Sequence, residues 1–172
     1  VNVKEGEGDD EYIITRLDHC SPALCIVNIY GEQEQRTSNE EVSERWTRLT
    51  QELDLIKSRG EMCLMIGDFN KQIGADDLGV KGNHEKITFG GQLVRELLNT
   101  EEYVLVNNMA VAEGGPFTRE DPADPEKKSC LDLVICSKNL EPFIKSLVID
   151  SERKYKIRRV VYQNGKFESV YS

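Results

Sequence analysis

The stretch Cys63-Leu64-Met65-Ile66-Gly67-Asp68-Phe69-Asn70 decides the fold that the sequence predicts. Its first four residues are apolar and predict a buried strand, which ends at a glycine. Side chains alternate between the two faces of a strand, so Asp68 and Asn70 are expected on one side and Phe69 on the other. A carboxylate and a carboxamide therefore share one side at the end of this strand.

Two interpretations of Asp68 and Asn70 remain open. A carboxylate accepts a proton from water or holds a divalent cation, and an amide group donates to a phosphoryl oxygen, which together suit hydrolysis of a phosphate ester. The alternative is a turn in which both side chains hydrogen-bond to the nearby backbone. Taken alone, these residues favour the turn.

The composition is that of one soluble domain of 172 residues, with 31% charged residues. No apolar stretch approaches the roughly 20 residues that cross a bilayer, so no membrane association is expected. The net charge of −9 argues against a simple nucleic-acid binder, because affinity for a phosphate backbone is mostly electrostatic. A nuclease can nevertheless keep an acidic, metal-recruiting pocket while local lysines and arginines contact the backbone.

The five cysteines include no Cys-x-x-Cys pair, and three of them lie inside apolar runs. They predict reduced core thiols of an intracellular protein, either nuclear or cytoplasmic. The two histidines, His19 and His84, are not next to a cysteine pair, which argues against a zinc site.

A helix is expected to connect two strands that end at polar residues. Residues 12–17 and 23–30 predict a hairpin whose second strand ends at Tyr30. Ser38 and Glu41 form a capping box, and Gly60 is placed to end the helix. Its apolar stripe consists of Val42, Trp46, Leu49, Leu53 and Ile56. This crossover brings Tyr30 and Asp68 to one end of a sheet, although Tyr30 also suits a half-buried strand position.

The remaining elements are predicted from shorter patterns. Residues 89–99 predict a second helix, and residues 103–107 a strand. Residues 117–119 and 129–137 predict strands joined by a loop over 120–128, and the chain ends in a hairpin that turns at 164–165. Residues 1–11 are expected to be loosely held. A basic stripe of Lys154, Lys156 and Arg158 suits either phosphate contact or protection of an edge strand.

Four motifs occur in a family-specific order: Asn28-x-Tyr30, Gly67-Asp68-x-Asn70, Phe117-Thr118 and Ser129-x-x-Asp132. This order resembles the endonuclease/exonuclease/phosphatase superfamily, most closely the endonuclease domain of non-LTR retrotransposons of the long interspersed element type. The resemblance spans nearly the whole chain but only the second part of such a domain. The family's early Asn and metal-binding Glu would precede Val1, and its closing Ser-Asp-His motif would begin at Ser172. It implies one truncated domain over 1–172, with an α/β fold that is part of a four-layer α/β/β/α sandwich.

The resemblance also implies roles for individual residues. Asp68 would position or deprotonate the attacking water, Asn70 and Tyr30 would hold the scissile phosphate, and Asp132 would orient a histidine. Mg²⁺ or Mn²⁺ would bind weakly through Asp68, since the main Glu ligand is absent. Substrate contacts are implied for Asn28, Thr118, Arg119 and Ser172, although many relatives carry Trp where Arg119 stands. The residues Tyr30, Asp68, Asn70 and Asp132 are expected to cluster in space.

The implied activity is metal-dependent nicking of DNA phosphodiester bonds, weak or absent in this chain because several catalytic groups lie outside it. One alternative is a non-catalytic, retroelement-derived binding module. A weaker alternative is a phosphomonoesterase of the same superfamily. The expected partners are DNA and either a second copy or the missing first half of the domain, bound through an exposed sheet.

Overall fold

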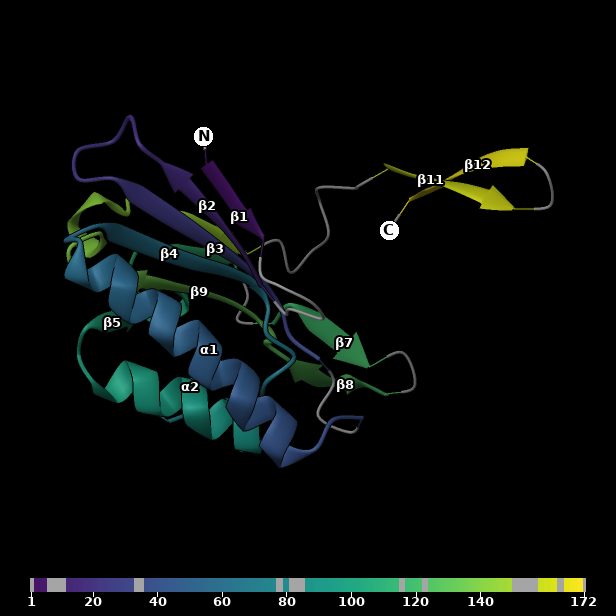
Figure 1. Ribbon diagram of the computed structural model, residues 1–172. Helices are drawn as coiled ribbons and strands as arrows, with labels where there is room; N and C mark the ends of the chain where they lie inside the picture. Colours follow the sequence, from purple (N-terminus) through teal and green to yellow (C-terminus); the bar gives the residue numbers. More distant parts are fainter. Residues whose placement is uncertain are drawn as a thin grey trace.

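The computed structural model describes residues 2–5, 12–32, 36–76, 79–80, 86–114, 117–121, 124–149, 158–163 and 166–171. A six-stranded sheet in the order β1-β2-β3-β4-β9-β5 carries two helices on one face (Figure 1). Its strands are β1 (Asn2–Glu5), β2 (Tyr12–Leu17), β3 (Leu24–Tyr30), β4 (Met62–Asp68), β9 (Asp132–Ser137) and β5 (Tyr103–Leu105). This mixed architecture confirms the predicted α/β fold class.

The predicted strand at 63–66 lies in the middle of the sheet as β4. It runs parallel to β3 and antiparallel to β9. Cys63 and Met65 are 1% and 0% exposed and face the helices, while Ile66 on the other face is 39% exposed. The expected crossover therefore exists, with α1 (Asn39–Ser58) between β3 and β4.

Helix α1 begins and ends as its sequence predicts. The Ser38 side chain accepts a hydrogen bond from the backbone N–H of Glu41, and the Glu41 carboxylate accepts one from the Ser38 N–H at 2.9 Å. At the other end Gly60 has a φ of +66°, the left-handed conformation that closes many helices. Four of the five predicted stripe residues are buried and Trp46 is partly buried, so the stripe packs on the sheet.

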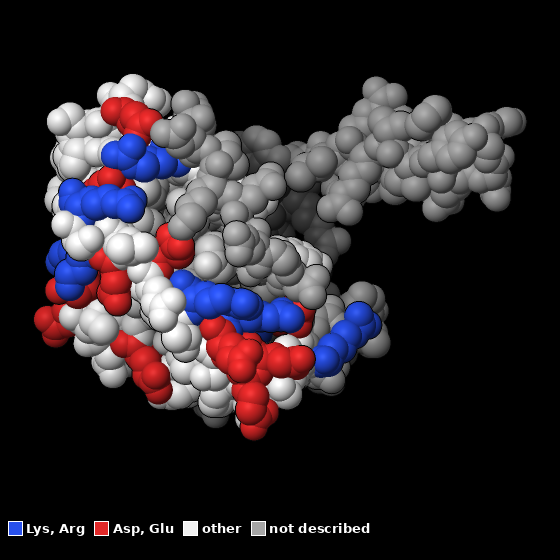
Figure 2. Space-filling view, in the orientation of Figure 1, with Lys and Arg blue, Asp and Glu red and all other residues white. Residues whose placement is uncertain are grey.

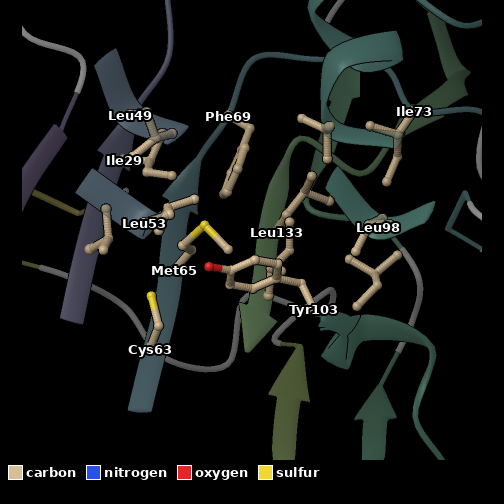
Figure 3. Close-up of a cluster of buried hydrophobic side chains, with 14 of the residues drawn as sticks. Ile29, Leu49, Leu53, Cys63, Met65, Phe69, Ile73, Leu98, Tyr103 and Leu133 are labelled. Carbon is tan, nitrogen blue, oxygen red and sulfur yellow. The ribbon is translucent and has the colours of Figure 1, made fainter. Parts of the chain in front are cut away.

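Helix α2 (Phe89–Asn99) has the predicted bounds and lies beside α1 (Figure 1). The Thr88 hydroxyl accepts a hydrogen bond from the Gly91 N–H and caps its first turn. Val94 and Leu98 are buried, and Leu93 and Leu97 are partly buried. Both helices complete one apolar core against β3, β4 and β9, which includes Ile29, Leu49, Phe69 and Leu133 (Figure 3).

Three predictions about shorter elements are wrong. Residues 2–5 form β1, paired with β2, instead of being loosely held. The expected loop over 120–128 is instead largely a hairpin of β7 (Arg119–Asp121) and β8 (Asp124–Ser129). Its sequence is polar throughout and carries no apolar alternation that would indicate a strand. The strand expected over 103–107 stops at Leu105, and a 3-10 turn η1 (Val106–Asn108) follows.

Smaller elements complete the described chain. They are β6 (Ala112–Gly114) parallel to β10 (Leu147–Ile149), the 3-10 turn η2 (Glu141–Phe143), and the predicted terminal hairpin of β11 (Arg158–Gln163) and β12 (Lys166–Tyr171). No helix among the described residues is both long and apolar enough to cross a membrane. Ser172, His84, Lys154 and Lys156 lie outside the described residues, and only the backbone of Arg158 is described.

The described part of the chain covers the sheet face opposite the helices at one end only. A second apolar cluster there contains Met62, Val106, Cys136 and Leu140. Towards the other end of this face, Ile13 is 43% exposed and Ile66 is 39% exposed. This less covered part of the face carries the polar residues described below.

A buried carboxylate, Glu61, connects β2 and β3 at the end of the sheet where β4 begins. Glu61 is 6% exposed and accepts hydrogen bonds from Arg16 Nε at 2.9 Å and from the Cys25 thiol at 3.2 Å. The Arg16 bond lowers the pKa of Glu61, and burial raises the pKa of Cys25 to about 11. Cys25 is therefore a protonated structural thiol. The prediction of core thiols is confirmed for four of the five cysteines, and Cys20 is only partly buried.

Candidate functional site

Three predicted site residues lie in one row across three neighbouring strands. Tyr30 on β3 is the register partner of Asp68 on β4, and Asp68 is the register partner of Asp132 on β9. Directly paired residues share a face of the sheet, so all three side chains lie on the face away from the helices. Tyr30 is 72% exposed, which rules out the half-buried position considered above. The expected convergence of these residues is present in the structure.

Asn28 lies on the same face, one row further from the end of the sheet. Its register partners are Ile13 on β2 and Ile66 on β4. Asn28 is exposed, and its two neighbours are among the exposed large apolar residues. The polar row at the sheet end therefore borders a second row that is mainly apolar.

Asp68 and Asn70 form the turn that was the alternative interpretation of this stretch. The Asn70 backbone N–H donates to Asp68 Oδ1 at 2.9 Å, and Asn70 Nδ2 donates to the Gly31 carbonyl at 2.6 Å. Asn70 has a φ of +50°, which asparagine tolerates better than most residues. The Asn70 amide also makes a side-chain hydrogen bond to the Asp68 carboxyl group, so Asn70 is bound to both Gly31 and Asp68.

The environment of Asp68 raises the pKa of its carboxyl group. Burial is the largest cause, and the negative charge of Asp132 adds to it. The Asn70 backbone N–H and the positive charge of Arg119 act in the opposite direction. A carboxylate with a raised pKa is a stronger base towards water.

Replacing Asp68 with asparagine is expected to raise the melting temperature at pH 7 by about 1–3 °C. The folded-state pKa of Asp68 is above the unfolded value of about 3.9, so stability falls as pH rises through that window. Asparagine does not ionise and avoids this loss. Thermal melts between pH 3 and pH 8 should show the difference shrinking below about pH 4. A destabilised variant, or an offset independent of pH, would contradict the assignment; Asp54→Asn, an exposed change on α1, is the control.

Asp132 is exposed, although its two sequence neighbours are apolar and buried. Alternation along β9 places its apolar neighbour Leu133 in the core and Asp132 in solvent. The Thr118 hydroxyl oxygen accepts hydrogen bonds from the backbone N–H groups of Leu131 and Asp132, at 3.1 and 3.2 Å. Thr118 thus holds the backbone next to Asp132 in this structure, and its predicted contact with nucleic acid stays a prediction.

Arg119 is exposed, and its positive charge acts on Asp68. A guanidinium group at this position could contact a phosphate group bound beside the row. Ser172, the remaining predicted contact, lies outside the described residues.

Asn107 was not singled out from the sequence, although its side chain bonds to the Asp132 segment. Its Nδ2 donates to the Asp132 carbonyl at 3.2 Å, and its Oδ1 accepts from the Val134 N–H at 2.8 Å.

Lys71 was also missed. It is 5% exposed and donates to the Glu32 carbonyl at 3.0 Å, which fastens the loop after β3 to the turn after β4. Neither residue belongs to a motif, and only the tertiary contacts reveal them.

The carboxylates of Asp68 and Asp132 are the oxygen donors that the row offers to a cation. Mg²⁺ keeps several water ligands and is commonly held by one or two carboxylates together with substrate phosphates. The donor set of the row therefore fits a weakly held Mg²⁺ ion. Among the described residues no group of three or more His, Cys, Asp or Glu side chains could hold a metal.

The surface around the helices carries charges of both signs. In Figure 2, Lys and Arg lie interspersed with Asp and Glu on the described part of this face, and no large area carries positive charge alone. This distribution gives the helix face no obvious surface for a phosphate backbone.

Comparisons with known proteins give distant structural similarity. No family model matches the chain, and no curated protein matches it. A beta toxin from Staphylococcus aureus is similar over 94% of this chain and 53% of its own, with a TM-score of 0.46 and 15% identity. An endonuclease/exonuclease/phosphatase family protein from Bacteroides thetaiotaomicron is similar over 86% of this chain and 45% of its own, with a TM-score of 0.40 and 11% identity. The chain thus spans about half the length of these two structures.

Proposed function

We propose that this chain is an endonuclease-like domain of the retrotransposon type, whose polar row binds a phosphodiester group of DNA together with Mg²⁺. The observation that carries the proposal is the register of Tyr30, Asp68 and Asp132 on three adjacent strands. These residues come from three separate motifs of the chain, and the order of those motifs supports the retrotransposon branch. Hydrolysis by these 172 residues is expected to be weak.

Each residue of the row has a chemical role in this proposal. The exposed Tyr30 hydroxyl donates a hydrogen bond to a non-bridging phosphate oxygen. The Asn70 amide donates another in exchange for its side-chain hydrogen bond to Asp68. Asp68, with its raised pKa, accepts a proton from the attacking water. Arg119 adds a positive charge near the phosphate. A bound Mg²⁺ would supply neutralisation of the negative charge on the phosphate and the carboxylates.

The acidity of the row makes DNA binding dependent on a divalent cation. Asp68 and Asp132 are adjacent, and a phosphate group brought next to them is repelled unless a cation lies between. Loss of one carboxylate should therefore weaken the Mg²⁺-dependent part of the affinity. This behaviour distinguishes the row from a basic DNA-binding surface, which needs no divalent cation.

The test is fluorescence anisotropy of a short labelled DNA duplex, with MgCl₂ or with EDTA. We expect binding with Mg²⁺ only, and about tenfold weaker binding for Asp68→Asn, equivalent to about 1.4 kcal/mol. Asp54→Asn makes the same charge change on exposed α1 and should leave the affinity unchanged. Equal binding by wild type and Asp68→Asn, or equal binding in EDTA, would refute the proposal.

Nicking of supercoiled DNA with Mg²⁺ is expected to be slight or undetectable. The resemblance assigns a Glu and a His to positions outside these residues, and removing several cooperating groups leaves only residual rate.

Parallel assays with a phosphate diester and a phosphate monoester address the phosphomonoesterase alternative. Hydrolysis of the monoester alone, lost in Asp68→Asn, would favour that alternative.

An interaction module is the second candidate, supported by the exposed pair Ile13 and Ile66 on either side of Asn28. Exposed apolar side chains on a sheet face favour association with another surface, such as a second copy of the chain. Analytical ultracentrifugation distinguishes the candidates. Self-association that Ile66→Glu abolishes, without Mg²⁺-dependent DNA binding by the wild type, would favour the interaction module.

A further inference from the structure

The outer edge of β9 is paired with a strand along only part of its length. β5 pairs with β9 from Tyr103 opposite Ser137 to Leu105 opposite Ile135, and then the chain leaves the sheet as η1. Among the described residues, the segment 132–134 therefore has β4 on one side and no strand on the other. The backbone groups of this segment that point outward need other partners.

Asn107 supplies these partners through its side-chain amide. Its Nδ2 donates to the Asp132 carbonyl at 3.2 Å, and its Oδ1 accepts from the Val134 N–H at 2.8 Å. A carboxamide has the same donor and acceptor as a peptide group, so this side chain takes the place of one residue of a neighbouring strand. Aspartate could accept the Val134 bond but could not donate to the Asp132 carbonyl.

Asp132 is held from the same edge by a second side chain. Thr118 Oγ1 accepts a hydrogen bond from the Asp132 N–H at 3.2 Å. Both backbone groups of Asp132 are thus bound by side chains. The carbonyl accepts from Asn107 and also from the Cys130 thiol at 3.3 Å, and the N–H donates to Thr118.

Asp68, which lies opposite Asp132 on β4, explains why the backbone of Asp132 needs these hydrogen bonds. The Phe69 N–H donates to the Leu131 carbonyl at 2.8 Å, so alternation along the antiparallel ladder makes Asp68 and Asp132 a non-hydrogen-bonded pair. Side chains of such a pair lie closest together, and like charges directly opposite each other are destabilising. The two carboxylates therefore push β9 away from β4 at this point.

We propose that Asn107 is a positioning residue, which holds the backbone of Asp132 so that its carboxylate stays opposite that of Asp68. The side-chain clamp on segment 132–134 opposes the repulsion between the two carboxylates. The expected effect of Asn107 on Mg²⁺ binding rests on the proposed function. The carboxylate pair that Asn107 holds in place is the pair that fits Mg²⁺, so loss of the clamp weakens Mg²⁺ binding.

The first test is amide hydrogen exchange by NMR in Asn107→Ala, with Asn108→Ala as the matched control. Asn108 is the next residue of the same 3-10 turn, and its Nδ2 donates to the Gly79 carbonyl, away from β9. We expect the Val134 N–H to exchange about tenfold faster in Asn107→Ala and at the wild-type rate in Asn108→Ala. Equal exchange rates in the two variants would overturn the inference.

Asn107→Asp distinguishes the contributions of the two hydrogen bonds. It also provides a test if Asn107→Ala fails to fold. It keeps the acceptor for the Val134 N–H but removes the donor to the Asp132 carbonyl. Val134 should stay protected, while the backbone resonances of Asp132 and Leu133 shift more than in Asn108→Asp. Loss of protection at Val134, or unchanged resonances at Asp132, would refute the proposed division between the two bonds.

The second test measures Mg²⁺ affinity from backbone resonances during addition of MgCl₂ alone. We expect the Kd to rise about threefold to tenfold in Asn107→Ala and to stay unchanged in Asn108→Ala. An unchanged Kd in Asn107→Ala would overturn the positioning role. A wild type that binds no Mg²⁺ would instead refute the proposed function, while the exchange of Val134 still decides whether the clamp exists.

Discussion

Replacing Gly67 with alanine is expected to lower the free energy of unfolding by about 4 kcal/mol or more, the largest effect of any single change considered for this chain. Gly67 has a φ of +145°, and a Cβ atom added there would lie 2.0 Å from the Ile29 carbonyl oxygen and 2.9 Å from its carbon. Both are backbone atoms of β3, so the clash is relieved only by separating β3 from β4 in the middle of the sheet. The same shift would break the row of Tyr30 and Asp68.

Urea denaturation followed by circular dichroism measures this loss, with Gly60→Ala as the matched control. Gly60 also has a positive φ, of +66°, but a Cβ atom there would meet nothing within 4 Å. Gly60→Ala should therefore cost only the conformational strain, about 1–2 kcal/mol. Similar losses in the two variants would mean that the close approach of β3 at Gly67 has no energetic importance.

Phe69→Ala is expected to destabilise the protein by about 3–5 kcal/mol. Phe69 is 2% exposed and heads the described fully buried side chains by volume. Its ring packs in the core with Ile29, Leu49 and Met65 (Figure 3). Truncation removes the buried apolar area and leaves a cavity at the junction of the sheet and the helices. The turn that presents Asp68 and Asn70 is anchored by this ring.

The midpoint of urea denaturation for Phe69→Ala should fall strongly, at an unchanged dependence on urea concentration. Phe143→Ala is the control because Phe143 is 66% exposed, and its free energy of unfolding should change by about 0.5 kcal/mol or less. A comparable loss in the control, or a small loss for Phe69→Ala, would show that the core does not depend on this side chain.

Elements with strong local signals were predicted well from the sequence. The capping box at Ser38 and the stripe on α1 are set by contacts three or four residues apart, and both are present. The buried strand at 63–66 is an apolar run that ends at Gly67, and it became the central strand β4. Hairpin β7–β8 was missed because its sequence is polar and lacks the alternation of apolar residues that indicates a strand.

The candidate site was predicted in part. Its motif residues could be identified from the sequence, but the residues that support them through tertiary contacts could not. Motif order places Tyr30, Asp68 and Asp132 in the site, and the register of β3, β4 and β9 brings them together. The role of Asn107, and the backbone contacts that Thr118 makes, could not be predicted in this way. These hydrogen bonds join residues 13 to 27 positions apart, and no local pattern encodes them.

The exposure of Asp132 illustrates the limit of patterns in a single strand. Its sequence neighbours Leu131 and Leu133 are apolar, and an apolar run does not reveal which face of a strand is covered. The structure covers the helix side of β9 with Leu133 and Ile135 inside and leaves Asp132 outside. Asp132 lies directly opposite Asp68 on β4, so the two carboxylates form a cross-strand pair.

The most direct measurement of the central claim is an NMR map of the ¹⁵N-labelled chain with a short DNA duplex and MgCl₂. The proposed site predicts that the largest shifts fall on backbone amides next to the row, at Gly31, Phe69, Asn70 and Asp132, and that they disappear in EDTA and in Asp68→Asn. Shifts concentrated on α1 or α2, or shifts at the row that persist without Mg²⁺, would contradict the claim that Tyr30, Asp68 and Asp132 form a metal-dependent phosphodiester site.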